Sequence, residues 1–154
     1  MRLVKKHILI IDSREQKPLA FYKSSVRVVT KKLDYGDYRM KFLDGKLADT
    51  VFERKTIPDL FGTMTKNHER FKKEMKKAHS DGVLMILIVE GSLSKVAKGI
   101  KHSKIQGISI IRTVFSLWVR YGVIPAFVEN RFEAAEFIIQ YFMAEYRKKQ
   151  NEKI

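Results

Sequence analysis

Cysteine is absent from the 154 residues of this sequence, and proline occurs only three times. Without cysteine there is no disulfide, no zinc–thiolate site and no cysteine nucleophile, so any bound metal must take oxygen or imidazole ligands. The first apolar run, from Ile8 to Ile11, is too short to cross a membrane, and no small-residue cleavage site follows it. We therefore expect an intracellular protein, in the cytoplasm and nucleoid or in the nucleus, with no membrane partner.

Acidic residues are also scarce relative to basic ones. Lys and Arg number 31 against 17 Asp and Glu, which gives a formal net charge of +14. Such an excess attracts polyanions, and the release of counterions from a nucleic acid backbone converts it into binding free energy. Binding to an anionic membrane would need a basic amphipathic helix with a free apolar face, or a lipidation signal, and neither is evident. The predicted partner is therefore a nucleic acid.

The balance of 45% hydrophobic and 31% charged residues is typical of a folded soluble protein. A chain of 154 residues suffices for one domain and is too short for two of ordinary size. We therefore expect a single domain over residues 1–154, in which the basic tail at 147–154 is frayed and solvated.

Hydrophobic periodicity predicts strands followed by an alternation of strands and helices. Short apolar runs and period-two alternation predict strands at residues 8–11, 24–33, 38–42, 49–55, 83–89 and 124–128. Helical spacing predicts a helix that begins at Pro58 and others at 67–79, 108–121 and 132–146. This order indicates the α/β class, with a mixed central β-sheet flanked by helices.

Two helical faces each allow two interpretations. One face of the 108–121 helix packs against the sheet, or packs there and also forms a dimer interface; it comprises Ile108, Ile111, Phe115 and Trp118. The second face is either solvated or grips phosphate; it comprises Lys72, Lys73, Lys76 and Lys77. The four histidines have no ligand spacing, and we assign them no role.

The strand at 49–55 carries a carboxylate and an ammonium on one face. Strand periodicity places Glu53 and Lys55 together and Arg54 on the opposite face. Such a pair can bind a divalent cation and hold an attacking water beside it, which phosphodiester hydrolysis requires. Because hard cations need more oxygen ligands than one carboxylate supplies, Asp37 is the natural second ligand. Gly36 before it lets the backbone bend toward the neighbouring strand.

A further acidic group follows the first strand. Asp12 and Glu15 lie just beyond its end, with Arg14 between them as a candidate phosphate contact. Together with Asp37 and Glu53 they form a set of acids at strand ends. An acid followed by Glu-x-Lys is the PD-(D/E)xK nuclease arrangement, which by itself arises readily by chance in a lysine-rich chain.

Four segments in order give a more specific resemblance: IIDSRE at 10–15, GDY at 36–38, ERKTIPDL at 53–60 and IVEG at 88–91. They resemble the nuclease domain of the XPF-type structure-specific endonucleases, and the resemblance continues through 105–107, 122–125 and the last helix. It implies a restriction-endonuclease-like nuclease fold. The implied activity is a DNA endonuclease, dependent on Mg²⁺ or Mn²⁺, that cuts near branched or flap-type junctions between duplex and single-stranded DNA.

The resemblance also assigns roles to residues. It implies that Asp37 and Glu53 are metal ligands, with Asp12 a third candidate, and that Lys55 is the catalytic base or an electrostatic helper. Asp12 and Glu15 complete the catalytic set. Arg54 and Asp59 match motif positions with a structural role. The DNA-binding candidates are Arg14, Arg54, Arg70, Lys72 and Lys76. Family members pair through their later helices, so a homodimer or heterodimer is expected.

This sequence departs from the family in two respects. Family members commonly have Gly-Arg followed by Gln after the motif, whereas this chain has His68-Glu69-Arg70 and then Glu74. Family enzymes also usually carry a helix-hairpin-helix domain, and some a helicase, neither of which we expect within residues 1–154. Substrate choice is then expected to depend on the basic surface of the domain, on dimerisation or on a partner protein.

Two alternatives remain open at this stage. One is a non-catalytic DNA-binding or scaffold subunit, since the same fold can host either function. Such a subunit has no reason to keep Asp12, Glu15, Asp37, Glu53 and Lys55 together, and this sequence has them all. The other is a general basic module for RNA or DNA, which predicts steep salt dependence and no metal requirement.

Overall fold

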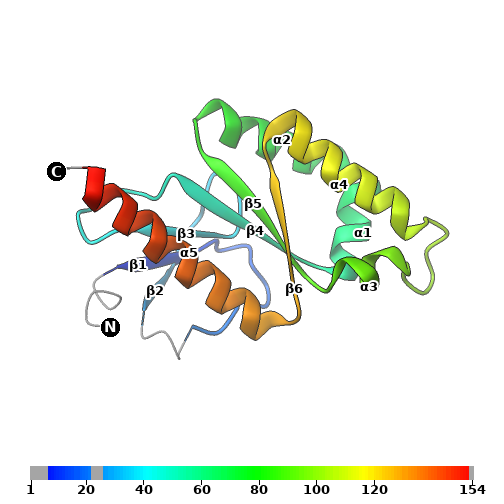
Figure 1. The fold of residues 1–154 in the computed structure, drawn as a ribbon, viewed down its shortest axis with the longest axis horizontal. Helices are drawn as coiled ribbons and strands as arrows, with labels where there is room; N and C mark the ends of the chain where they lie inside the picture. The colour runs from blue at the N-terminus through cyan, green and yellow to red at the C-terminus, as the bar shows by residue number, and fades with distance from the viewer. Residues whose placement is uncertain (1–6, 22–25, 153–154) are drawn as a thin grey trace.

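A six-stranded sheet runs through the computed structural model, which describes residues 7–21 and 26–152 (Figure 1). The strands, in the order β2-β1-β3-β4-β5-β6 across the sheet, are β2 (Arg27–Thr30), β1 (Ile8–Ile11), β3 (Tyr38–Lys41), β4 (Thr50–Thr56), β5 (Leu84–Glu90) and β6 (Ile124–Val128). The helices are α1 (Ile57–Thr65), α2 (His68–Ser80), α3 (Leu93–Ala97), α4 (Gly107–Tyr121) and α5 (Arg131–Glu152).

The sheet is mixed, as the sequence predicted. β1 is parallel to β2, β3 is antiparallel to both β1 and β4, and β4, β5 and β6 are parallel. β4 and β5 pair along all seven of their residues, with Glu53 opposite Leu87. On its other side, β4 pairs with β3 at Tyr38 and Phe52. The full-length pairing with β5 makes β4 a rigid support for side chains at its carboxyl end.

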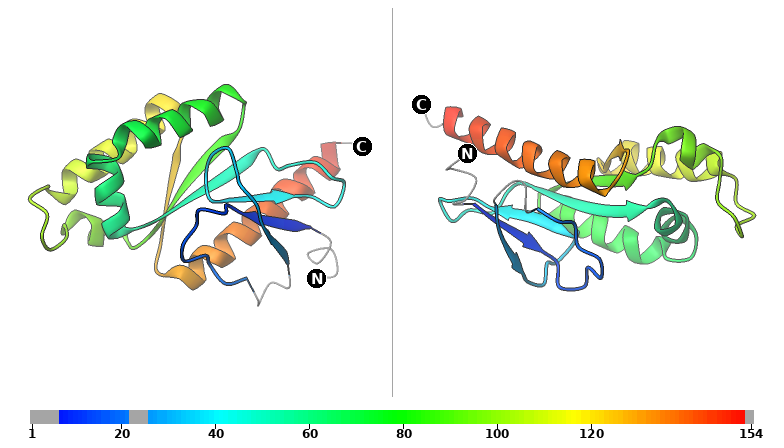
Figure 2. Two further views of the ribbon diagram at one scale, coloured as in Figure 1. Left: turned by 180° about the vertical axis from the view of Figure 1, so that it is seen from behind. Right: turned by 90° about the horizontal axis from the view of Figure 1, so that it is seen from below.

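Helices cover both faces of the sheet (Figure 2). Alternate residues of β4 point to opposite faces, so Phe52 packs with α5 residues such as Phe142, whereas Val51 packs with Leu60 of α1 and Val114 of α4. Glu53 lies two residues after Val51 and therefore points to the same face of the sheet as Val51. The pleat therefore directs Glu53 and Lys55 to one face of the sheet, as the sequence predicted. Helices α1 and α2 cover that face.

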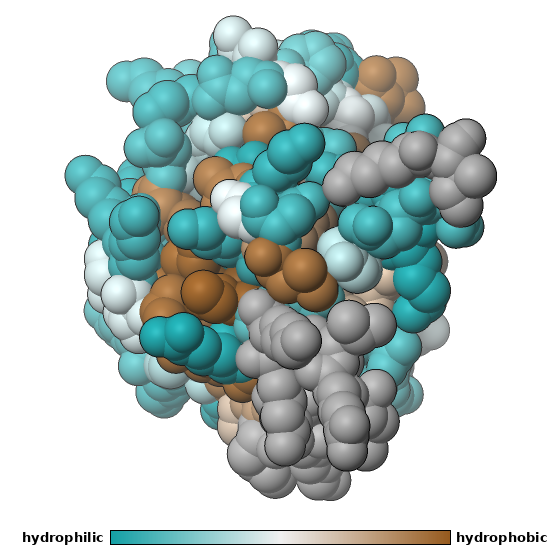
Figure 3. Space-filling view, turned by 90° about the vertical axis from the view of Figure 1, so that its left-hand side faces the viewer, coloured by the Kyte–Doolittle hydropathy of each residue, from teal (hydrophilic) through white to brown (hydrophobic). Residues whose placement is uncertain are grey.

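The last helix is longer than expected. The tail predicted to fray at 147–154 is helical as far as Glu152, and residues 153–154 lie outside the described part. The reason is that the tail is anchored: Lys149 forms ion pairs with Asp49 at 3.0 Å and Glu145 at 3.9 Å, and Lys148 pairs with Glu152 at 3.5 Å. Hydrophilic side chains dominate this end of the molecule, with apolar groups between them (Figure 3).

The face of α4 that packs inward is not the predicted one. Ile111 is buried, but Ile108, Phe115 and Trp118 are 43%, 37% and 42% exposed. The core contacts come from Ile110, Ile111, Val114 and Leu117. Apolar residues occupy two adjacent faces of α4, and only packing against α1 and the sheet selects between them.

The structure also differs from the sequence-based predictions at α3 and β2. The short helix α3, which Ser92 caps through its side chain, was not predicted. β2 spans only Arg27–Thr30 of the predicted 24–33, and residues 22–25 lie outside the described part. Among the described helices, none has the length and hydropathy of a membrane span.

Candidate active site

Glu53 and Lys55 form an ion pair at the carboxyl end of β4. Lys55 Nζ lies 2.9 Å from Glu53 Oε1, and the side chains are 19% and 7% exposed. Burial raises the pKa of Glu53 above its ordinary value, although the Lys55 ammonium opposes this rise. Burial alone would lower the pKa of Lys55, but the Glu53 carboxylate raises it overall. Lys55 is therefore a charged ammonium in this arrangement.

Asp37 is held against β4 by its own backbone and by the glycine before it. Its N–H donates to the Phe52 carbonyl at 2.7 Å, and its Oδ2 accepts the Arg54 N–H at 2.8 Å. Gly36 has a φ of +74°, and a Cβ there would collide with Val51. Burial and the neighbouring Glu53 carboxylate raise the pKa of Asp37 well above its ordinary value. The half-buried Asp37 and the buried Glu53 thus lack full compensation of their charge.

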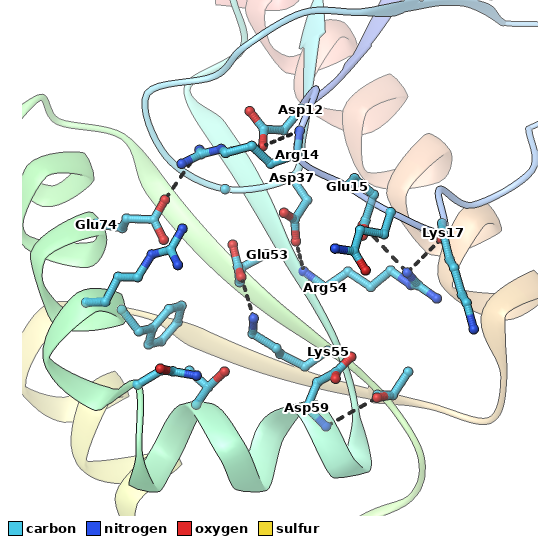
Figure 4. A pocket seen from close by; sticks show the side chains of 17 residues that line it. Asp12, Arg14, Glu15, Lys17, Asp37, Glu53, Arg54, Lys55, Asp59 and Glu74 are labelled. Atoms are coloured by element: carbon cyan, nitrogen blue, oxygen red, sulfur yellow. Dashed lines mark hydrogen bonds and ion pairs between the residues drawn. The ribbon is translucent and has the colours of Figure 1, made fainter.

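Asp12 lies beside them with both oxygens already engaged. Its Oδ1 accepts the Leu33 N–H at 2.8 Å, and its Oδ2 accepts Arg14 Nε at 2.8 Å and the Arg14 N–H at 3.2 Å. Burial would raise the pKa of Asp12, but these hydrogen bonds lower it below its ordinary value. Arg14 also reaches Glu74 of α2 at 3.7 Å. Arg14 therefore links β1 to α2 across the mouth of the site (Figure 4).

Arg54 is the hub of a second set of contacts on the opposite face of β4. Its Nε lies 2.6 Å from Glu90 Oε1, and its Nη1 lies 3.6 Å from Glu15 Oε2 and 2.9 Å from the Lys17 carbonyl. Glu15 also accepts the Tyr38 hydroxyl at 3.1 Å. The Arg54 side chain is only 9% exposed. It ties β5 and the loop after β1 to β4, so its guanidinium is committed to protein contacts.

A cavity of about 530 Å³ joins these groups between the ends of β1 and β4 and the helices α1 and α2. Most of the predicted site residues line it: Asp12, Arg14, Glu15, Asp37, Glu53, Arg54, Lys55 and Arg70. Asp59 of α1 and Glu74 of α2 add two further carboxylates. Lys72 and Lys76, predicted to bind DNA, do not line it, because Lys72 borders α4 and Lys76 lies over the Tyr121 ring.

The chain is similar to known proteins over most of its length. The family model of the ERCC4 domain matches residues 11–141. The chain belongs to the ERCC4 domain family. XPF from Aeropyrum pernix has a similar fold, with a TM-score of 0.70 at 19% identity over 95% of this chain. A second structure of it, in complex with DNA, has a TM-score of 0.67 at 20% identity over 94% of this chain.

This ERCC4 domain spans 68% and 66% of the two XPF chains. No curated protein matches its sequence. The restriction-endonuclease-like nuclease fold that the sequence predicted is confirmed by the likeness to XPF, and the predicted α/β mixed sheet by the strand order.

The carboxylate oxygens in the cavity of this ERCC4 domain are suitable ligands for a hard divalent cation. In the described part of the chain, no three acids or histidines are arranged to enclose a metal. Asp37 and Glu53 nevertheless supply two carboxylates, which is the number that proteins usually offer Mg²⁺, whose other ligands are water and phosphate oxygens. Burial raises the pKa values of both carboxyl groups, so a cation bound between them would stabilise their charged forms.

The sequence did not indicate that Glu74 belongs to the site. It appeared only as a departure from the family pattern, although it follows Arg70 by four residues and therefore shares its helical face. Lys17, Thr63 and Asn67 also line the cavity. No signal in the sequence marks these three, because the folding of distant segments brings them there.

Proposed function

We propose that this chain is a divalent-metal-dependent DNA endonuclease that hydrolyses phosphodiester bonds near junctions of duplex and single-stranded DNA. The observation that carries the proposal is the convergence of Asp37, Glu53 and Lys55 in one cavity. The ERCC4 domain match and the DNA complex of the similar XPF support DNA as the substrate. A DNA substrate would place the protein in the cytoplasm and nucleoid or in the nucleus.

Asp37 and Glu53 would hold Mg²⁺ or Mn²⁺. When bound, the cation would neutralise phosphoryl oxygens and lower the pKa of water. Among the described residues, Asp37 and Glu53 each keep one carboxylate oxygen without a hydrogen bond or an ion pair. Both oxygens of Asp12, in contrast, are engaged and together accept three hydrogen bonds. We therefore give Asp12 the role of orienting Arg14 and include only Asp37 and Glu53 as ligands.

Lys55 acts as an electrostatic helper. Its ammonium donates to Glu53 at 2.9 Å and keeps protons available for a phosphate oxygen or an attacking water. A charged ammonium has no lone pair with which to act as a base. Arg14 and Arg70 complete the phosphate contacts, because both line the cavity and are exposed at its rim, where the Arg14 side chain is 45% exposed.

The test is a cleavage assay with flap, fork and splayed-arm DNA in Mg²⁺ or Mn²⁺. The wild-type chain should cut, and chelation of the metal should stop cutting. Asp34→Asn and Glu129→Gln, which remove exposed acids outside the cavity, should leave the rate unchanged. A folded chain that leaves all these substrates intact would be the non-catalytic subunit instead.

We also propose that a second copy of this chain packs on the exposed stripe of α4. The stripe comprises Ile108, Phe115, Trp118 and Val119, and the Phe115 and Trp118 rings stack with centroids 6.0 Å apart. Val119 is 87% exposed, and the neighbouring β6 ends the sheet with an unpaired edge in the described part of the chain. Apolar side chains clustered on one helical face are typical of an interface between copies.

Sedimentation of the purified chain tests this arrangement. We expect a dimer for the wild type and a monomer for Trp118→Arg/Val119→Glu, with an unchanged circular dichroism spectrum. A wild-type chain that is monomeric at all concentrations would contradict self-pairing and leave a different partner chain as the occupant.

A further inference from the structure

A second hollow, of about 330 Å³, lies between α2 and α4 and shares no residue with the catalytic cavity. The two helices lie side by side in both Figure 1 and Figure 2. We call this hollow the α2–α4 groove; it is lined by His68, Lys72, Arg112, Thr113, Ser116, Leu117, Arg120 and Tyr121. Among the described residues, no carboxylate lines it. The charged side chains that line the groove, Lys72, Arg112 and Arg120, are therefore all basic.

The cations of the groove converge because of helix geometry. Arg112, Ser116 and Arg120 follow one another at intervals of four residues, which places them on one face of α4. Lys72 reaches the same hollow from α2. Within residues 7–21 and 26–152, no salt bridge engages Lys72, Arg112 or Arg120. Uncompensated like charges held this close favour a polyanionic ligand.

The groove adjoins the catalytic cavity across a single helix. Arg70 and Glu74 of α2 line the cavity, whereas His68 and Lys72 line the groove. An α-helix with its side chains is about 10–12 Å across. A nucleic acid strand that leaves the cavity therefore needs to cross only this distance to reach the next cluster of cations.

We propose that the α2–α4 groove binds the phosphate backbone of the single-stranded arm of the DNA substrate. The guanidinium groups of Arg112 and Arg120 would bind phosphate oxygens, and the Ser116 hydroxyl can donate to them. Tyr121 lines the groove, and Lys76 Nζ lies 5.9 Å from the centroid of its ring. An unpaired base would stack on this ring in place of that ammonium or on the opposite face, which a paired base cannot do. This assignment rests on the proposed endonuclease function for the identity of the strand.

The test measures binding rather than cleavage. Fluorescence anisotropy is recorded without metal, on the Asp37→Asn background, with a thymidine oligonucleotide and with a duplex of the same length. Arg112→Gln/Arg120→Gln is compared with Arg27→Gln/Arg147→Gln, which removes two exposed arginines outside both hollows. Circular dichroism and the thermal midpoint verify that each variant is folded.

The groove variant should bind the oligonucleotide about tenfold more weakly, and its slope of log K against log salt should fall by about 1.4, because two contacts to a single strand are lost. The control variant should bind within about twofold of the parent, and duplex binding should change less than oligonucleotide binding. Equal losses in both variants, or an equal loss for duplex and oligonucleotide, would overturn the proposal.

The two proposals fail separately in this design. If the wild-type chain cuts no DNA but the groove variant loses oligonucleotide binding, the endonuclease proposal fails while the groove remains a nucleic acid site. If the chain cuts DNA and the groove variant binds the oligonucleotide as tightly as its parent does, only the groove proposal fails.

Discussion

The two sides of helix α2 differ in charge and in burial. On one side, six carboxylates line the proposed catalytic cavity: Asp12, Glu15, Asp37, Glu53, Asp59 and Glu74. On the other side, the α2–α4 groove has only neutral and basic side chains among its lining residues. Glu53 is 5% exposed, whereas Arg112 and Arg120 are exposed. A chain with a net charge of +14 thus concentrates acid where the proposed reaction takes place.

This difference separates chemistry from binding. Burial raises the pKa values of Asp37 and Glu53 in the cavity, so their negative charges cost stability. The cations of the groove remain hydrated and bind phosphate mainly through counterion release. Substitutions on the cavity side should therefore change rate and stability, and substitutions on the groove side should change affinity and its salt dependence.

The largest effect is expected for the two proposed metal ligands. Asp37→Asn and Glu53→Gln keep the size of each side chain and remove its charge, so cleavage should fall on the order of 10³-fold. Single-turnover cleavage with the metal in excess measures this loss. Binding of the same DNA in the absence of metal should persist, because the groove cations are untouched. A cleavage rate close to that of wild type would remove the substituted residue from the site.

The next largest effect concerns Arg54, which compensates the charges of Glu90 and Glu15. Arg54→Gln leaves both carboxylates without their partner and should destabilise the fold by about 3 kcal/mol. The thermal midpoint should then fall by about 6–12 °C for a chain of this size. Scanning calorimetry compares the thermal midpoint of Arg54→Gln with that of Arg27→Gln, which alters an exposed arginine. Equal midpoints for the two variants would show that Arg54 does not hold the cavity together.

A stabilising effect is expected from Asp37→Asn without metal. Burial and Glu53 raise the pKa of Asp37, so the folded state retains its proton at pH values where the unfolded state has lost it. The free energy of unfolding of the wild type should therefore fall as pH rises from about 4 toward the raised pKa. The variant should show a smaller fall and be more stable at neutral pH by about 1–2 kcal/mol.

Urea unfolding of metal-free protein at several pH values measures the pH dependence of the unfolding free energy and the difference in stability between wild type and variant. Added Mg²⁺ should stabilise the wild type and not the variant, because binding to the folded state alone raises its stability. Identical pH profiles for wild type and variant would contradict the interpretation of Asp37 as a buried charge without compensation.

The smallest effect concerns the groove during turnover. Arg112→Gln/Arg120→Gln should raise KM for a forked substrate about threefold and leave kcat unchanged, because the lost contacts hold the DNA equally before and during the reaction. Steady-state cleavage at fixed ionic strength measures both constants. A lower kcat with an unchanged KM would show that these arginines act in the chemical step. It would contradict the distinction between a cavity for chemistry and a groove for binding.

The sequence predicted the site better than the surfaces around it. Period-two alternation placed Glu53 and Lys55 on one face of β4, and the structure has them there, 2.9 Å apart. The predicted inward face of α4 was wrong for Ile108, Phe115 and Trp118, because a helix that is apolar on two sides has no local signal for which side meets the sheet. The prediction that the tail frays from residue 147 was wrong as far as Glu152, because Lys149 of this segment pairs with Asp49, which is far away in the sequence.

The sequence by itself determined the strand and helix order apart from the short helix α3, the acids at the strand ends and the excess of positive charge, because these follow from local periodicity and composition. Only the tertiary structure decided that Glu74 joins the cavity, that Arg54 turns to Glu90, and that Arg112 and Arg120 meet Lys72. Each of these depends on the packing of segments distant in the chain, and no pattern within one segment encodes which side chain its neighbour will present.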